Sequence, residues 1–193
     1  DTAEQYLREA LVSKQEAQDT LGIPELLLWL GEIYEIRTIL DKAEDYYRQC
    51  LEDYKIGRPY FDSVALAGMV RTLTRQQQFE RIPSLFNQAE TLAQQNEYYD
   101  HLASLYLTRG HLVWEGSIPD WESGFEAALK SYQNSLIYAL RYNRFLLDEV
   151  LSGGVPTALQ SLIPHCLEKG ENGKKMLIAL HDWWNSETSV TGT

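Results

Sequence analysis

The sequence has few cysteines, few positive charges and no long hydrophobic run. Only two of its 193 residues are cysteine, Cys50 and Cys166, and both lie in apolar helical patterns. This excludes a disulfide scaffold and predicts two small buried side chains. No stretch approaches the roughly 18 consecutive apolar residues that cross a bilayer, and the start does not resemble a signal peptide. We therefore expect a cytoplasmic protein that does not associate with a membrane.

Positive charge is scarce relative to negative charge. The chain has 17 Lys and Arg against 28 Asp and Glu, which gives a formal net charge of −11. A chain of this charge repels a phosphate backbone, and no basic stripe in the sequence overrides that repulsion locally. We expect no nucleic-acid partner. The acidic balance suits a partner that carries a basic segment.

Patterns specific to catalysis or metal binding are also missing. The histidines form no HExxH pair, and neither cysteine has a partner at ligand spacing; they are His101, His111, His165 and His181. His165 and Cys166 are adjacent, so on a helix their side chains diverge by about 100°. Gly153-Gly154 lacks the Lys-Ser or Lys-Thr that follows in a phosphate-binding loop. We predict no catalytic residue, no metal and no cofactor, and a protein that is not an enzyme.

Helical periodicity runs through nearly the whole sequence, and no alternating strand pattern is bounded by tight turns. Glycine and proline mark the breaks between helices, for example at Gly22 and Pro24 and from Gly57 to Pro59. We therefore predict an all-α fold. Its ten expected helices cover residues 2–20, 24–37, 40–56, 61–76, 80–96, 98–115, 121–142, 144–152, 156–168 and 172–186.

One segment carries a regular order of large and small residues: Leu27, Leu30, Gly31, Tyr34, Ala43, Tyr47 and Cys50. The order resembles the tetratricopeptide repeat (TPR), in which a first helix bearing Leu-Gly and Tyr pairs with a second helix bearing Ala, an aromatic and a small residue. Small side chains at Gly31 and Ala43 predict that two antiparallel helices approach closely there. Leu30, Tyr34 and Tyr47 are expected to fill the space beside this contact.

The pattern returns further along the chain. A second pair carries Leu66, Met69, Val70, Leu73, Ile82, Phe86 and Ala89, and a third carries Tyr106, Gly110, Val113, Ala128, Tyr132 and Ser135. Counting from Ala3 through Ala43 and Ile82 to Ala128 gives periods of 40, 39 and 46 residues. The first two periods resemble lengthened TPR variants, as in the sensor arms of STAND-type signalling ATPases. The resemblance implies a right-handed α-α superhelix, a TPR-like solenoid.

The resemblance also implies a domain organisation. Residues 1–23, with Ala3, Leu7 and Ala10, are expected to form the second helix of a truncated repeat. Residues 24–142 then form three helix pairs. Residues 143–186 form a degenerate pair and a closing helix that covers the end of the stack, and residues 187–193 form a disordered tail. Trp183 and Trp184 either pack under that closing helix or contact a missing downstream domain.

In TPR proteins the first helices line a concave groove that holds a peptide. Carried over to this sequence, the resemblance implies a groove that is acidic at one end, basic in the middle and aromatic at the other end. Trp29 lies beside this stripe and is expected to pack between repeats. The expected groove residues are Leu28, Glu32, Glu35, Arg71, Arg75, Leu107, His111 and Trp114.

The resemblance therefore implies a module that binds a protein or peptide, as the sensor or scaffold region of a larger signalling protein. Upstream domains of the same polypeptide are a further expected partner. Two alternatives stay open at the level of sequence. The chain could be the regulatory repeat region of an enzyme, such as a protease or phosphatase, or a structural spacer that associates with itself.

Overall fold

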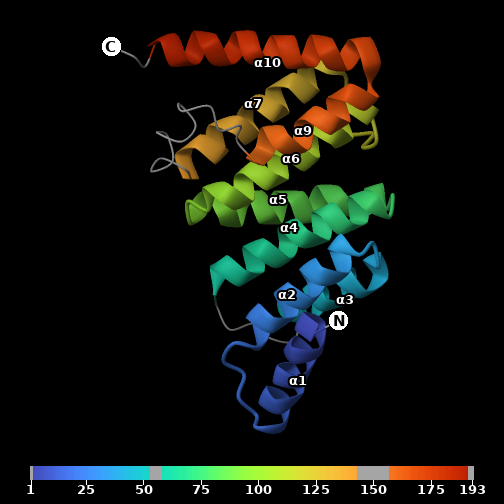
Figure 1. The fold of residues 1–193 in the computed structure, drawn as a ribbon, viewed down its shortest axis with the longest axis vertical. Coiled ribbons are helices and arrows are strands. Elements are labelled where there is room, and N and C mark those ends of the chain that lie inside the picture. Colours follow the sequence, from blue (N-terminus) through green and yellow to red (C-terminus); the bar gives the residue numbers. More distant parts are fainter. Residues whose placement is uncertain (1, 53–57, 143–156, 191–193) are drawn as a thin grey trace. The chain divides into compact units, whose positions relative to one another are not determined.

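A computed structural model of the chain describes residues 2–52, 58–142 and 157–190 (Figure 1). All regular structure within these residues is helical, which confirms the all-α prediction. They form nine α-helices and a 3-10 helix at Phe79–Arg81. The α-helices are α1 (Thr2–Glu16), α2 (Ile23–Ile36), α3 (Leu40–Glu52), α4 (Pro59–Arg75), α5 (Ile82–Gln95), α6 (Tyr99–Glu115), α7 (Phe125–Tyr142), α9 (Thr157–Glu168) and α10 (Gly170–Val190).

Proline and glycine set many of the helix boundaries. Pro24, Pro59 and Pro83 each occupy the first turn of a helix, where the missing N–H costs nothing. Two predicted boundaries were wrong. The first helix ends at Glu16 rather than residue 20, because Gln18 has a positive φ of 53°. The helix expected from residue 121 begins at Phe125, directly after Gly124 with φ 105°.

The C-terminal boundary also differs from the expectation. Helix α10 continues to Val190, four residues beyond the predicted end at residue 186. The predicted helix over 144–152 and the break at Gly153-Gly154 lie outside the described residues. No described helix combines the length and apolar character that a bilayer crossing needs.

The chain divides into two compact units, Asp1–His101 and Leu102–Thr193, and the division falls inside α6. In the first unit, helices that follow one another in sequence are packed against one another: α1 on α2, α2 on α3, α3 on α4 and α4 on α5. Helix α4 also contacts α2, two positions earlier. This neighbour-to-neighbour order is consistent with a helical-repeat arrangement.

The core of the first unit confirms the residues of the repeat pattern. All seven members of the first pattern are buried: Leu27, Leu30, Gly31, Tyr34, Ala43, Tyr47 and Cys50. A Cβ added at Gly31 would lie 2.7 Å from Cε1 of Tyr47, and one added at Gly68 would lie 2.5 Å from Cζ of the same ring. The close approach at Gly31 is thus made to the Tyr47 ring, which sits between two glycines. Gly68 was not part of the predicted pattern.

Two expectations for the first unit were wrong. Trp29, expected to pack between repeats, is 47% exposed, whereas its neighbour Leu28 is 4% exposed and belongs to the core. Ala3, from which the repeat period was counted, is exposed, whereas its counterpart Ala43 is fully buried. Helix α1 packs against the core through Leu7 and Leu11, and Glu4 accepts hydrogen bonds from Tyr34 and Arg37, whereas the Ala3 side chain faces solvent.

The second unit packs α10 on α7 and α9, and α7 on α9. Its buried core comprises Val113, Ala128, Tyr132, Leu136, Leu162, Cys166, Met176 and Leu180. Gly110 repeats the relationship seen at Gly31, because a Cβ there would fall on the ring of Tyr132. Trp183 and Trp184 on α10 are partly buried against this core. Both predicted buried cysteines are confirmed as buried free thiols.

Candidate functional site

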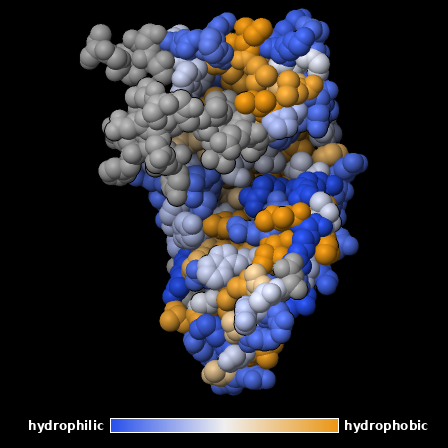
Figure 2. Space-filling model, in the orientation of Figure 1, coloured by the Kyte–Doolittle hydropathy of each residue, from blue (hydrophilic) through white to orange (hydrophobic). Residues whose placement is uncertain are grey.

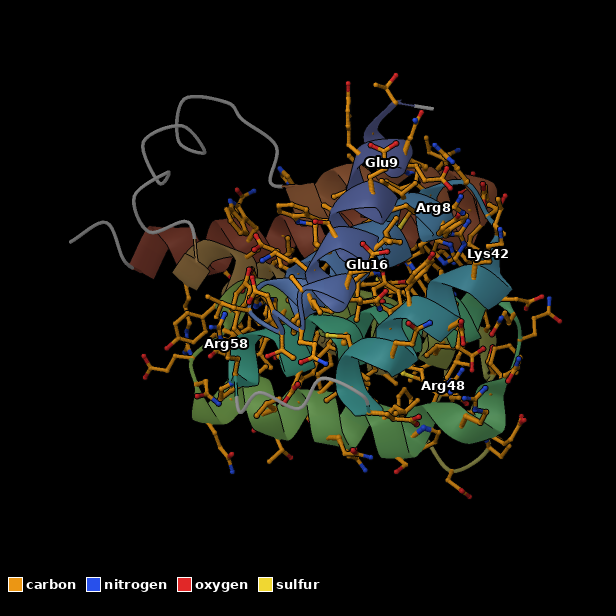
Figure 3. All side chains as sticks on the ribbon, turned by 90° about the horizontal axis from the view of Figure 1, so that it is seen from below. Arg8, Glu9, Glu16, Lys42, Arg48 and Arg58 are labelled. Atoms are coloured by element: carbon orange, nitrogen blue, oxygen red, sulfur yellow. The ribbon has the colours of Figure 1, made fainter. Side chains whose placement is uncertain are left out.

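The residues expected to line the groove fall into both units. Leu28, Glu32, Glu35, Arg71 and Arg75 belong to the first unit, whereas Leu107, His111 and Trp114 belong to the second. Within each unit the structure brings most of them into contact with other side chains. Other charged side chains lie on the surface of the first unit, among them Glu9 on α1 and Arg48 on α3, which are labelled in Figure 3.

In the first unit, three of the predicted groove residues, Glu35 on α2 and Arg71 and Arg75 on α4, contact one another. Arg71 donates from Nε to Glu35 Oε1 at 3.0 Å and from Nη2 to Oε2 at 2.9 Å. Tyr47 on α3 donates its hydroxyl to Glu35 Oε2 at 2.9 Å, and Arg75 donates to the Glu35 backbone carbonyl at 2.6 Å. Burial raises the pKa of Tyr47 far above its ordinary value, and the Glu35 charge raises it further. This network ties three helices together.

The charges in this network largely satisfy one another. Glu35 is only 9% exposed and forms a bidentate pair with Arg71, a geometry that is strong because both N–H groups of the fork are used. Glu32 lies close to that pair. Burial raises its pKa, the nearby Arg71 opposes the rise, and the Glu35 charge adds to it. Because Leu28 is buried in the core, it presents little surface to a ligand.

In the second unit, the predicted residues on α6 face other parts of the unit. The His111 ring lies 4.1 Å from the ring of His165 on α9, centroid to centroid, and Trp114 lies 5.6 Å from His165. Leu107 and Trp114 pack against the core. The contact between His111 and His165 was not predicted, because the two residues are 54 positions apart.

Three polar atoms in this region are buried without a hydrogen-bond partner: Nε2 of His111, Nε2 of His165 and the hydroxyl of Tyr132. Burial lowers the pKa of His111 to about 4, and the neighbouring His165 and Lys169 lower it as well, against a rise from Glu115. The missing partners of the two Nε2 atoms and the lowered pKa of His111 both favour neutral imidazole rings at pH 7; burial lowers the pKa of His165 as well. Among the residues that the structure describes, no three His, Cys, Asp or Glu side chains are arranged to hold a metal ion.

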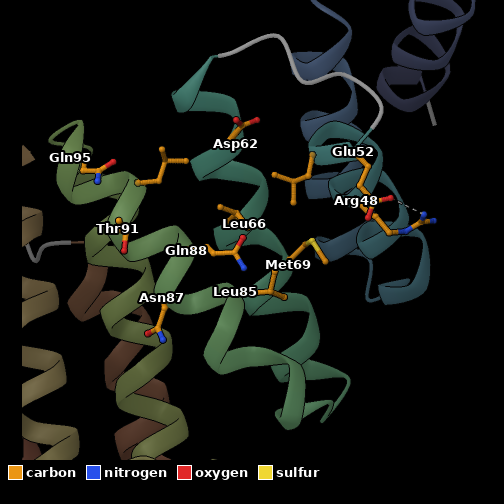
Figure 4. Close-up of a pocket in the computed structure, with 12 residues that line it drawn as sticks. Arg48, Glu52, Asp62, Leu66, Met69, Leu85, Asn87, Gln88, Thr91 and Gln95 are labelled. Carbon is orange, nitrogen blue, oxygen red and sulfur yellow. Dashed lines mark ion pairs between the residues drawn. The ribbon is translucent and has the colours of Figure 1, made fainter.

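A groove of about 700 Å³ lies in the first unit between α3, α4 and α5 (Figure 4). Its apolar lining comes from all three helices: Leu51, Leu66, Met69, Leu85 and Leu92. Leu66 and Met69 are nearly buried and form the floor, whereas the three other leucines keep partial exposure. Such a groove can accept apolar side chains from a ligand.

The two walls of the groove differ in chemistry. The α3 wall is charged, because Arg48 pairs with Asp45 and approaches Glu52 to 3.5 Å. The α5 wall carries neutral amides and a hydroxyl, from Asn87, Gln88, Thr91 and Gln95. Asp62 adds a further carboxylate from α4. A bound segment would therefore meet an apolar floor, a charged wall and a neutral polar wall.

The sequence pattern did not predict this groove, because the predicted binding residues lie on the first helix of each pair. The groove instead draws on both second helices of two consecutive pairs, α3 and α5. Two leucines could have indicated the groove in the sequence. Leu51 directly follows the pattern residue Cys50, Leu85 directly precedes the pattern residue Phe86, and neither leucine belongs to the predicted core.

Patches of hydrophobic side chains among hydrophilic ones are visible over each unit in Figure 2.

Comparison with known proteins adds no relative to this description. The chain was compared with protein-family models, with characterised proteins and with solved structures, and none of the three comparisons found a match.

Proposed function

We propose that this chain is a helical-repeat module that binds a protein or peptide, in the manner of the TPR proteins that its sequence resembles. Support comes from the order of packing in the first unit, where each helix contacts its sequence neighbours and α4 also contacts α2. Stacked helix pairs of this kind provide extended surfaces that recognise other chains. A sensor or scaffold role in a larger signalling protein is part of this proposal.

The groove between α3, α4 and α5 is the observation that carries the proposal. The floor of the groove is formed by the buried side chains of Leu66 and Met69. Around it lie three partly exposed leucines, Leu51, Leu85 and Leu92. Burying one leucine-sized side chain of a ligand is worth about 1.5–3 kcal/mol. Two or three such side chains spaced along one face of a peptide helix would supply the main driving force, and the polar walls would set its orientation.

The polar network on the α2–α4 face has a different role in this proposal. Glu35 and Arg71 are paired, and Tyr47 connects the pair to α3. A ligand charge would have to break this pairing in order to bind either residue. We therefore assign the network to holding α2, α3 and α4 in register, so that α3 and α4 present a fixed groove. Arg75 donates to the Glu35 carbonyl, and its side chain is exposed at the edge of this face.

Selection from a displayed library of helical peptides tests the groove directly. Peptides selected on the full chain are expected to bind Leu85→Glu at least about tenfold more weakly, because a carboxylate replaces a buried contact. Leu21→Glu is the matched control, since Leu21 is 58% exposed and lies outside the groove. Circular dichroism would establish that both variants keep their helices.

Two results would contradict the groove assignment. One is equal binding of the selected peptides to Leu85→Glu and to Leu21→Glu. The other is loss of binding in Arg75→Glu with none in Leu85→Glu, which would return the site to the α2–α4 face.

Self-association is a second candidate, favoured by one observation. Trp29 and Ile36 lie seven residues apart on one side of α2 and are 47% and 81% exposed. A second copy of the chain could cover these two apolar side chains. Sedimentation over a concentration series would show a dimer that Ile36→Glu abolishes; a monomer at all concentrations would remove this candidate.

A further inference from the structure

Two imidazole rings pack against each other in the second unit, one from α6 and one from α9. The centroids of His111 and His165 lie 4.1 Å apart with 37° between the ring planes, and the Trp114 ring packs across His165 at 5.6 Å. The Nε2 atom of each histidine is buried and has no hydrogen-bond partner. The two rings are therefore held together by packing, without a hydrogen bond at either Nε2.

This contact accommodates neutral imidazoles and opposes charged ones. A neutral ring can carry its proton on Nδ1 and leave Nε2 unprotonated, whereas an imidazolium carries a proton on both nitrogens. Protonation of His111 or of His165 would thus bury an N–H group at Nε2 without an acceptor. Protonation of both would also set two like charges against each other across 4.1 Å. Proton uptake therefore favours an arrangement in which the two rings are separated.

The charged and titratable groups around the two rings do not reverse this preference. Glu115 on α6 forms an ion pair with Lys169, which directly follows α9, so their opposite effects on the rings largely cancel. Glu168 on α9 is exposed, and water screens its charge. The Tyr132 hydroxyl on α7 and the Cys166 thiol on α9 stay uncharged, because burial raises the pKa of both groups. Burial is the largest influence on the pKa of both imidazoles, and it lowers both.

Helix α9 is suited to move away from its neighbours. With 12 residues it is the shortest of the described α-helices, and it carries Pro164 in its interior, directly before His165. Proline has no N–H to donate to the preceding turn, so α9 lacks one hydrogen bond of a regular helix. Its inner side places Leu162 and Cys166 in the core of the unit. Release of α9 would separate the two imidazoles and expose the Cys166 thiol.

We propose that the stack of His111 and His165 is an acid-sensitive latch, which holds α9 against α6 at neutral pH and releases α9 as the rings take up protons. The released state accepts these protons in water, so acid shifts the population toward it. A histidine in water titrates near pH 6.5, which places the shift between about pH 7 and pH 5. Helices α7 and α10 contact each other directly and can stay packed when α9 leaves. This inference is independent of the groove in the first unit.

The two cysteines of the chain test this proposal, because both are buried free thiols and each unit holds one. A pyridyl disulfide reagent, which reacts with thiols even in acid, labels a cysteine when it becomes accessible. From pH 7 to pH 5 the labelling rate of Cys166 in the full chain should rise at least about tenfold, after correction for the rate with the urea-unfolded chain at each pH. Cys50 in the first unit should show no comparable rise.

Histidine variants identify the group that takes up the proton. His111→Phe should remove most of the rise at Cys166, because phenylalanine keeps a ring in the stack and binds no proton. His181→Phe is the matched control and should keep the full rise, since His181 on α10 is 72% exposed in its side chain and lies outside the stack. If His111→Phe does not fold, His165→Phe provides the same test.

Three results would overturn the latch. The first is an equal rise at Cys166 and Cys50, and the second is a rise in His111→Phe as large as in the wild type. The third concerns urea at concentrations below the unfolding transition. Local release of α9 exposes little surface, so the labelling rate of Cys166 at pH 5 should depend weakly on urea. A dependence as steep as that of unfolding would show that the unit unfolds as a whole.

Discussion

The ring of Tyr47 occupies the space that a side chain at Gly31 would need. Tyr47 lies on α3 and is fully buried, and Gly31 lies on α2 with its hydrogen facing the ring. Gly68 on α4 faces the same ring from another side. Because this ring projects from α3 and contacts both α2 and α4, its fit controls how the first unit packs.

Gly31→Ala is therefore expected to destabilise the first unit. Overpacking a closed core costs about 1–3 kcal/mol, which exceeds the gain of about 1 kcal/mol from replacing glycine inside a helix. In a Tyr47→Leu background the same substitution should be neutral or stabilising, because the ring atoms are gone. Urea denaturation followed by circular dichroism measures both effects. An equal cost in the two backgrounds would contradict the contact.

Two neighbouring glutamates on α2 should respond in opposite ways. Glu35→Ala leaves Arg71 without its bidentate partner and Tyr47 without its acceptor, so we expect a loss of about 1.5–3 kcal/mol at pH 7. The free energies of unfolding of Glu35→Ala and of the wild type, measured by urea denaturation at pH 7, test this prediction. A loss close to zero would show that the pair is not formed in solution.

Glu32→Gln should instead stabilise the chain at pH 7. Burial raises the pKa of Glu32 in the folded state, so ionisation above that pKa disfavours folding. The glutamine variant avoids this penalty. Its advantage should shrink as the pH falls through the ordinary range of a carboxyl group, where the wild-type side chain takes up its proton. An advantage that does not change with pH would point to a different cause.

Stability of the second unit should fall as the pH drops below 6.5. The pKa of His111 is lowered by burial to about 4, so between pH 6.5 and 4 the folded state binds fewer protons than the unfolded state. Linkage then predicts a loss of about 2 kcal/mol between pH 7 and pH 5. The pKa of His165 is lowered as well, chiefly by burial, which acts in the same direction.

His111→Phe should remove most of this pH dependence while keeping a ring against His165. Urea denaturation followed by tryptophan fluorescence reports mainly on the second unit, which holds four of the five tryptophans: Trp114, Trp121, Trp183 and Trp184. A variant that loses stability toward pH 5 as steeply as the wild type would show that the imidazole is not responsible.

Local features were predictable from the sequence because they depend on residues close in the chain. Helical periodicity, the proline positions and the small residue at Gly31 fall in this class. The outcome at Leu28 and Trp29 shows the limit. Adjacent side chains on a helix point about 100° apart, so a modest error in how the helix is rotated exchanges which of them is buried. The structure buries Leu28 and exposes Trp29.

The candidate sites were less predictable because they combine distant segments. The groove requires Leu51 on α3 and Leu85 on α5 to line one hollow beside α4, and the charge pairing requires Glu35 to reach Arg71. Neither arrangement follows from residue spacing along one helix, because each joins residues on different helices. Gly68 was missed because the repeat pattern aligned Val70 with Gly31, although Gly68 is the residue that touches Tyr47.

The most direct test of the groove uses the two methionines of the chain, labelled with ¹³C in the methyl group. Met69 lies in the floor of the groove, and Met176 is buried in the core of the second unit. On addition of a peptide selected on the full chain, the Met69 methyl signal should shift and saturate while the Met176 signal stays in place. A bound peptide that leaves the Met69 signal unchanged would contradict the account.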